Sequence, residues 1–207
     1  MERAPLVSGL RRLARPPVAA PPVEAVERCE LCGAALPDDH RHLLNLEQRV
    51  IVCACETCVA VRGGDGPYRP AGQRVVWLPG LDLPDDLWAR FAIPIGLAFF
   101  LRSSVDGAAT ALYPSPGGAT ECELDLGAWD ELVALNPVLG DFEPDAEALV
   151  VDRLGEPRRY AIAPIDECYR LVGLVRTAWS GISGGDEVGR AVAGFFAELQ
   201  QRAQRAQ

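Results

Sequence analysis

The sequence contains the segments Cys29-Glu30-Leu31-Cys32-Gly33 and Cys53-Ala54-Cys55-Glu56-Thr57-Cys58, which hold five of its seven cysteines. Two cysteines separated by two residues can turn both sulfurs toward one metal ion. A second such pair completes the tetrahedron of ligands that Zn²⁺ accepts. We therefore predict a metal site formed by Cys29, Cys32, Cys55 and Cys58.

The residues between these pairs predict a β-hairpin. Residues 41–46 and 49–53 are the expected strands, and Glu47-Gln48 is the expected turn. Gly33 follows the first pair directly, where a positive φ is expected because glycine has no Cβ to clash. Cysteine pair, hairpin and cysteine pair together resemble the layout of a zinc ribbon.

Three side chains near this site leave alternatives open. Cys53 could replace Cys55 as a ligand or lie buried as a small strand residue, and burial is favoured because free cysteines are often buried. His40 and His42 could each supply an imidazole ligand, although four cysteines already suffice.

Disulfides are the alternative to a metal site. No apolar run of the length of a signal peptide precedes the cysteines, so we expect a cytoplasmic protein. Paired cysteines in such proteins hold metal more often than they form disulfides. The metal interpretation is therefore favoured.

The identity of the metal follows from the surroundings of the cysteines. Four thiolates can hold Zn²⁺ or a single iron. No glycine follows the second pair and no aromatic residue lies between Cys29 and Cys58. A rubredoxin-like iron site for electron transfer is expected to have tighter turns and an apolar aromatic shell. A structural zinc ion is therefore favoured, with iron as the alternative.

Composition limits the classes of function. The chain has 207 residues, of which 49% are hydrophobic, and a net charge of −9. Residues 1–72 hold 9 Arg and 9 acidic residues, whereas residues 73–207 hold 11 Arg and 20 acidic residues. Nucleic-acid binders normally present a basic surface, so this role is disfavoured. No apolar stretch approaches the roughly 20 residues of a membrane span.

The chain divides by composition into four segments. We expect a flexible tail rich in Arg, Pro and Ala at 1–24, the metal module at 25–62, a Gly-rich linker at 63–72 and an acidic α+β domain at 73–207. In that domain the pattern predicts strands near 74–78, 95–101, 110–113, 121–126, 148–151 and 159–162, and helices near 84–91, 128–135, 166–179 and from 183 onward. The hairpin signals favour a mainly antiparallel sheet covered by the later helices.

Further segments suggest chemistry more weakly. Pro114 to Thr120 is small enough to approach a ligand, but it lacks the pattern of a phosphate loop and is interpreted as a connection. Asp166-Glu167-Cys168 is interpreted as a helix cap followed by a buried cysteine, and Ser183 to Asp186 as another cap. An enzyme that uses Cys168 or the 114–120 loop is the third and weakest hypothesis.

Five motifs together resemble a bacterial family of unknown function whose members are encoded beside nickel–iron hydrogenase genes. They are Cys29 to Gly33, Arg41-His42-Leu43, Cys53 to Cys58, Tyr113-Pro114-Ser115-Pro116 and Ile165-Asp166-Glu167-Cys168-Tyr169-Arg170-Leu171-Val172-Gly173. The resemblance implies a cytoplasmic accessory protein for hydrogenase assembly or electron transfer, and it supplies no catalytic residues.

Two main hypotheses follow. In the first, zinc stabilises the metal module of a non-enzymatic assembly factor, and the acidic domain binds a hydrogenase subunit or a maturation factor. In the second, the same four cysteines hold iron and the protein transfers single electrons.

Overall fold

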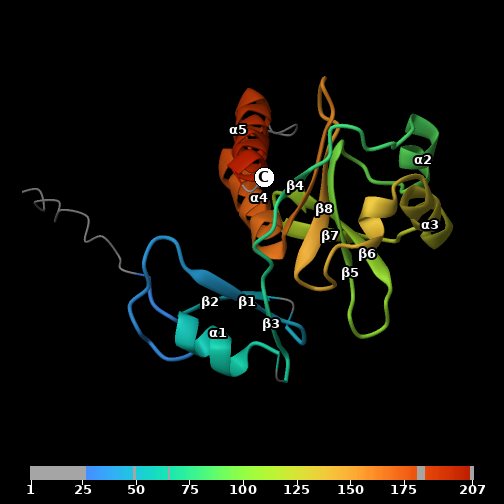
Figure 1. Cartoon of the computed structure of the whole chain (residues 1–207). Helices are drawn as coiled ribbons and strands as arrows, with labels where there is room; N and C mark the ends of the chain where they lie inside the picture. Colours follow the sequence, from blue (N-terminus) through green and yellow to red (C-terminus); the bar gives the residue numbers. More distant parts are fainter. Residues whose placement is uncertain (1–26, 49, 65, 181–184, 206–207) are drawn as a thin grey trace, which may run out of the picture.

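The computed structural model describes residues 27–48, 50–64, 66–180 and 185–205 (Figure 1). A small module with the cysteine pairs lies beside a larger α+β domain (Figure 1). The predicted tail at 1–24 and the predicted cap Ser183 lie outside the described residues.

The small module is built on the predicted hairpin. Strands β1 (Arg41–Asn45) and β2 (Val50–Ala54) pair antiparallel, and helix α1 (Glu56–Arg62) follows them. The turn between the strands is held by Asn45, whose Oδ1 accepts hydrogen bonds from the backbone N–H groups of Glu47 at 3.0 Å and Gln48 at 3.1 Å. This side chain therefore fixes the predicted turn.

Part of the predicted linker at 63–72 is a strand. Residues Tyr68–Pro70 form β3, which pairs antiparallel with β1 and gives the sheet order β2-β1-β3. Pro70 lacks a backbone donor, and proline is tolerated in a strand at the edge of a sheet. The glycines and prolines of this segment led to the prediction of a linker, although it contains a short edge strand. The sheet of the module therefore extends to residue 70.

The larger domain is built on an antiparallel sheet, as predicted. Its strands are β4 (Val76–Trp77), β5 (Leu97–Arg102), β6 (Ala109–Ser115), β7 (Gly118–Cys122), β8 (Glu147–Asp152) and β9 (Arg159–Pro164). Their order in the sheet is β4-β9-β8-β5-β6-β7, and every pairing is antiparallel.

Helices cover both faces of this sheet. One face packs against α4 (Ile165–Ala178) and α5 (Gly185–Arg205), and the other packs against α2 (Asp85–Arg90), α3 (Leu126–Leu135) and η2 (Pro137–Gly140). Neighbouring residues alternate between the two cores: Phe99 belongs to the first and Phe100 to the second. The sequence predicted that the later helices cover the sheet. Helices α4 and α5 do so on one face, and a second helical layer covers the other face (Figure 1).

In the segment from 114 to 128, two observed element boundaries differ from the predicted ones. Residues 114–119 were expected as a loop, but β6 continues to Ser115 and β7 begins at Gly118. The expected strand at 121–126 ends at Cys122, because Asp125 caps α3 by accepting a hydrogen bond from the Ala128 N–H at 3.0 Å. The cap residue therefore sets both the end of the strand and the start of the helix.

The segment after β3 joins the module to the larger domain. The Ala71 N–H donates to the His42 carbonyl and the Gly72 N–H donates to the Ala146 carbonyl, both at 3.0 Å. Ala71 itself packs into the core beneath α4 and α5. Among the described residues, no helix combines the length and hydrophobicity that a membrane span requires.

Candidate metal centre

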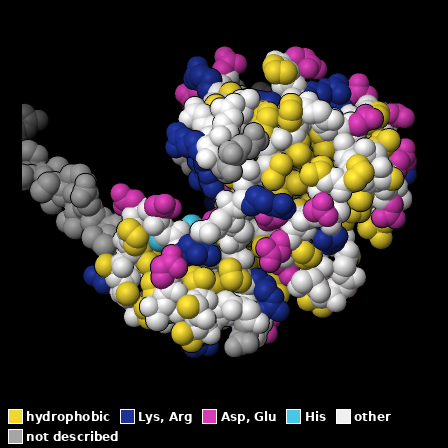
Figure 2. All heavy atoms as spheres, viewed as in Figure 1, with side chains coloured by type: hydrophobic (Ala, Val, Ile, Leu, Met, Phe, Trp, Pro, Cys, Tyr) yellow, Lys and Arg dark blue, Asp and Glu magenta, His cyan; other side chains and the backbone are white. Residues whose placement is uncertain are grey.

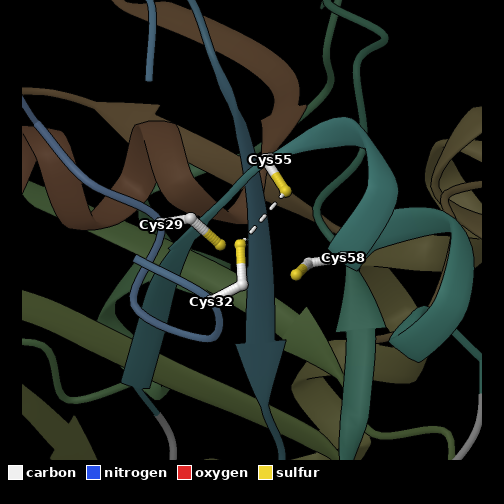
Figure 3. A group of neighbouring side chains, drawn as sticks. All are labelled: Cys29, Cys32, Cys55 and Cys58. Carbon is white, nitrogen blue, oxygen red and sulfur yellow. Dashed lines mark hydrogen bonds between the residues drawn. The ribbon is translucent and has the colours of Figure 1, made fainter. Parts of the chain in front are cut away.

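The first cysteine pair lies on a tight backbone turn. The Cys29 N–H donates to the Ala34 carbonyl at 2.8 Å, and the Gly33 N–H donates to the Cys29 carbonyl at 2.7 Å. Gly33 has a φ of 76°, which confirms the expected positive φ. This turn holds Cys29 and Cys32 on the same side of the chain (Figure 3).

The second cysteine pair lies at the start of a helix. Cys55 is the N-cap residue of α1, and Cys58 lies in its first turn. In the zinc-ribbon layout that the sequence suggested, the second pair lies on a turn instead. The helix forms here because the Val59 N–H donates to the Cys55 carbonyl at 3.0 Å and the Val59 side chain is buried in the module.

A backbone hydrogen bond brings the two pairs together. The Glu30 N–H, between the cysteines of the first pair, donates to the Cys53 carbonyl at 3.0 Å. One ligand atom from each of Cys29, Cys32, Cys55 and Cys58 lies within 4.8 Å of the others. Figure 3 shows the four sulfurs pointing toward a common centre.

The spacing of the sulfurs fits a tetrahedral ion. The Cys32 and Cys55 sulfurs are 3.7 Å apart. Zinc–sulfur bonds of about 2.3 Å in a tetrahedron place the sulfurs about 3.8 Å apart, whereas a disulfide bond is about 2.05 Å long. All seven cysteines lie among the described residues and none of them forms a disulfide bond, so the disulfide alternative is wrong.

The ionisation of the four thiols is uneven. Burial opposes ionisation of Cys29, but the backbone N–H groups of Cys55, Leu31 and Cys32 stabilise its thiolate and lower its pKa to about 6. Burial and the neighbouring sulfurs of Cys32, Cys55 and Cys29 raise the pKa of Cys58 to about 12. A divalent cation at the centre would relieve the repulsion between the thiolates.

The cysteine group packs against the small apolar core of the module. Cys29 is buried with Leu36, Leu43, Val52 and Val59, while Cys32 is exposed. Apolar surroundings slow the access of water to a metal site. The four cysteines are therefore able to hold a metal ion that is shielded from water on the Cys29 side and open to it at Cys32.

Cys53 lies outside this group. Its sulfur lies in a second group with His40 and His42, in which one ligand atom from each residue lies within 4.8 Å of the others. Cys53 is half-buried, and burial together with the charges of Glu30 and Glu27 raises its pKa. Neither histidine belongs to the group of four cysteines, so the structure separates the residues that the sequence offered as substitute ligands.

The strand register explains the second group. His42 is directly opposite Cys53 in the β1–β2 pairing, and cross-strand partners share one face of a sheet. His40 precedes His42 by two residues, which is the spacing of side chains on one face of a strand. The pattern His-x-His opposite Cys was visible in the sequence, but its meaning depended on the register.

Asp166 does not cap α4. The N-cap residue is Pro164, and the Asp166 Oδ2 lies 2.8 Å from the His42 Nδ1. This hydrogen bond raises the pKa of His42, and partial burial acts in the opposite direction. The contact joins the module to the larger domain.

The remaining candidate residues have structural roles. Cys168 is completely buried, and burial raises its pKa well above the usual thiol value, as expected for a core cysteine. In the 114–120 segment, the Ser115 Oγ donates to the Gly118 carbonyl at 3.0 Å and accepts from the Gly117 N–H at 3.2 Å. These groups stabilise a hairpin turn, which favours the interpretation as a connection.

One comparison with known proteins gives a match. The profile of a protein family described as a family of unknown function (DUF5947) matches residues 28–203. No curated protein and no solved structure shows significant similarity to the chain. The match includes the cysteine and histidine groups described above.

Proposed function

Because the chain belongs to this family of unknown function, we propose its function from the cysteine site: it is a zinc-stabilised accessory protein that binds a protein partner. The convergence of four sulfurs, with Cys32 and Cys55 at 3.7 Å, carries the proposal. Zinc accepts this geometry and has no redox chemistry, so its role is to stabilise the module. Such ions contribute about 10 kcal/mol or more to the folding of small modules.

Iron in the same four-cysteine site is the second candidate. The exposure of Cys32 favours it, because an exposed ligand brings a metal centre close to a redox partner at the surface. Against it, the pair Cys55 and Cys58 lies on a helix and not on a second tight turn. If the site holds iron, the protein would transfer single electrons.

Metal analysis with an absorption spectrum separates the two candidates. We expect the purified protein to be colourless, and the Cys55→Ser/Cys58→Ser variant to contain one zinc equivalent less than wild type. The variant Cys122→Ser, which removes a thiol from the larger domain, is the control and should keep its zinc. A red, reducible protein would show that the site holds iron and not zinc. Equal metal content in all three proteins would overturn both the zinc and the iron assignment.

The partner that we propose is a hydrogenase subunit or a hydrogenase maturation factor. The resemblance of the cysteine, Tyr113-Pro114-Ser115-Pro116 and Ile165–Gly173 motifs to proteins encoded beside hydrogenase genes supports this choice. Residues 73–207 hold 20 acidic residues and only 11 Arg. This negative charge supports a protein partner over nucleic acid, whose phosphates are also negative.

Affinity purification from the native host, followed by mass spectrometry, tests the partner. We expect a hydrogenase-related protein to co-purify with wild type and to be depleted with the Cys55→Ser/Cys58→Ser variant. The absence of every hydrogenase-related protein from the wild-type sample would overturn the hydrogenase assignment. The zinc assignment would be unaffected, because the metal analysis tests it separately.

A further inference from the structure

The second group of metal-ligating side chains lies on the face of the β1–β2 hairpin that is turned toward the larger domain. His42 and Cys53 are cross-strand partners there, and His40 lies two residues before His42. Ile51 lies on the Cys53 side of β2 and packs against the core beneath α4 and α5. Histidine atoms are visible at the boundary between the two parts of the molecule in Figure 2.

Both imidazole rings are oriented through the same nitrogen. The His42 Nδ1 lies 2.8 Å from a carboxylate oxygen of Asp166. The His40 Nδ1 lies 3.0 Å from the Pro37 carbonyl oxygen and 3.4 Å from a carboxylate oxygen of Glu27. Oxygen acceptors at Nδ1 fix the proton on that atom and leave the Nε2 lone pair free, which is the arrangement that metal-binding histidines show.

Within the part of the chain that the structure describes, the Nε2 of His40 has no hydrogen-bond partner. The His40 side chain is only 6% exposed, and its Nε2 is buried without a hydrogen-bond partner among the described residues. A buried polar atom without a partner destabilises the folded protein. A metal ion held between this atom, His42 and the Cys53 sulfur would satisfy it.

Asp166 is itself fixed in position. Its Oδ1 accepts a hydrogen bond from the Glu167 N–H at 2.9 Å, while its Oδ2 faces His42. The carboxylate thus holds the ring of His42 from the first turn of α4. In zinc sites a carboxylate commonly accepts a hydrogen bond from the ring N–H of a histidine whose other nitrogen binds the metal.

A cleft opens beside the two histidines. It has a volume of about 490 Å³, and the residues that line it include His40, His42, Asp38, Asp39, Asp166 and Arg202. Cys53 does not line this cleft, so the two histidines are the ligands that face it. A tetrahedral ion held by His40, His42 and Cys53 keeps a fourth coordination position for water or another ligand. The four-cysteine site differs, because its protein ligands complete the tetrahedron.

We propose that His40, His42 and Cys53 form a second site for a divalent transition-metal ion such as Zn²⁺, with an open fourth position toward the cleft. Imidazole and thiolate together suit zinc and its neighbours in the first transition row. The site uses other side chains than the four-cysteine site, so it does not rest on the function proposed above.

Zinc stoichiometry at equilibrium tests the proposal. Dialysis against a buffered concentration of free Zn²⁺ should give two zinc ions per chain for wild type and one for His40→Ala/His42→Ala. The variant Cys53→Ala should also give one, and circular dichroism shows whether each variant is folded. Equal zinc content in wild type and the histidine variant would overturn the second site and leave the four-cysteine site standing.

X-ray absorption on zinc-loaded wild type makes the test independent of variant folding. The sequence has two histidines, and both belong to this group, so imidazole scattering at zinc reports this site. We expect zinc to show both sulfur and imidazole ligands. A spectrum with sulfur ligands and no imidazole would overturn the proposal while supporting the four-cysteine site.

The role of Asp166 as a positioning residue has its own test. The variant Asp166→Asn should weaken zinc binding at the second site by about 10–100-fold, as loss of an outer-shell partner does. Asp186→Asn makes the same change of charge at an exposed position of α5 and should leave the affinity unchanged. Equal affinities for the two variants would overturn the positioning role.

Discussion

At the scale of single residues, Glu147 is a buried charge near the junction between module and larger domain. Its side chain is 4% exposed, and the Arg74 guanidinium donates to its two carboxylate oxygens at 3.0 and 2.7 Å. The Glu143 N–H donates to the same carboxylate at 3.0 Å. A buried carboxylate that loses its cation remains desolvated without compensation.

We expect Arg74→Ala to lower the free energy of unfolding by about 2 kcal/mol, because it leaves the buried Glu147 without its cation. Arg158→Ala is the control, since it breaks an ion pair with the largely exposed Asp85, and such pairs contribute little. Urea denaturation measures both. Similar losses for the two variants would contradict the special role of Glu147.

Cys168 provides a prediction about reactivity. The thiol is completely buried and its pKa is raised by burial and by the charges of Asp166 and Glu167. Thiolates are the reactive form, so iodoacetamide should leave Cys168 unmodified in the folded protein and modify it in urea. Peptide mass spectrometry measures both states, and modification of Cys168 in the folded protein would support the enzyme hypothesis.

At the scale of elements, α5 covers one face of the sheet through a few large side chains. Phe196 is completely buried, and its ring lies 6.4 Å from the ring of Trp77 and 5.1 Å beneath the Arg159 guanidinium. We expect Phe196→Ala to cost about 3–5 kcal/mol of stability, because the lost apolar contacts leave a cavity. The variant Gln200→Ala, at an exposed position of the same helix, should change stability by less than about 0.5 kcal/mol.

Removal of metal should unfold the small module and leave the larger domain folded. A chelator is expected to abolish protection from hydrogen exchange in β1, β2 and α1, because the module has a small core of its own. Strands β5 and β8 lie inside the larger sheet and should keep their protection. Exchange measured by mass spectrometry tests this, and unchanged protection in β1 and β2 would show that the metal is dispensable for the module.

The elements that could be predicted from sequence are those specified by local pattern. The two cysteine pairs, Gly33 and the hairpin between them follow from spacing, and the antiparallel sheet follows from hairpin signals. Strand β3 was missed because it pairs with β1 and has little pattern of its own. The contact between His42 and Asp166 joins residues 124 positions apart and could not be inferred from local sequence.

At the scale of the whole molecule, the close approach of backbones at Gly72 connects the two parts. A Cβ at this position would lie 2.9 Å from the Glu147 Cγ and 3.0 Å from the Ala146 carbonyl oxygen. We expect Gly72→Ala to destabilise the protein by about 1–3 kcal/mol through this overlap. The opposite sign is expected for Gly189→Ala in α5, where a Cβ meets open space and alanine favours helix by up to about 1 kcal/mol. Thermal unfolding measures both variants, and stabilisation by Gly72→Ala would contradict the overlap.

The order of strands in the two sheets has a consequence for synthesis on the ribosome. The small sheet pairs residues between 41 and 70, so all its partners have left the ribosome early in translation. In the large sheet, β4 pairs with β9 and β5 pairs with β8, so these early strands wait for residues near 147–164. Domains generally fold as they are made, from the N-terminus onward. The nascent chain can therefore complete its cysteine module before the larger domain has all the strands that it needs.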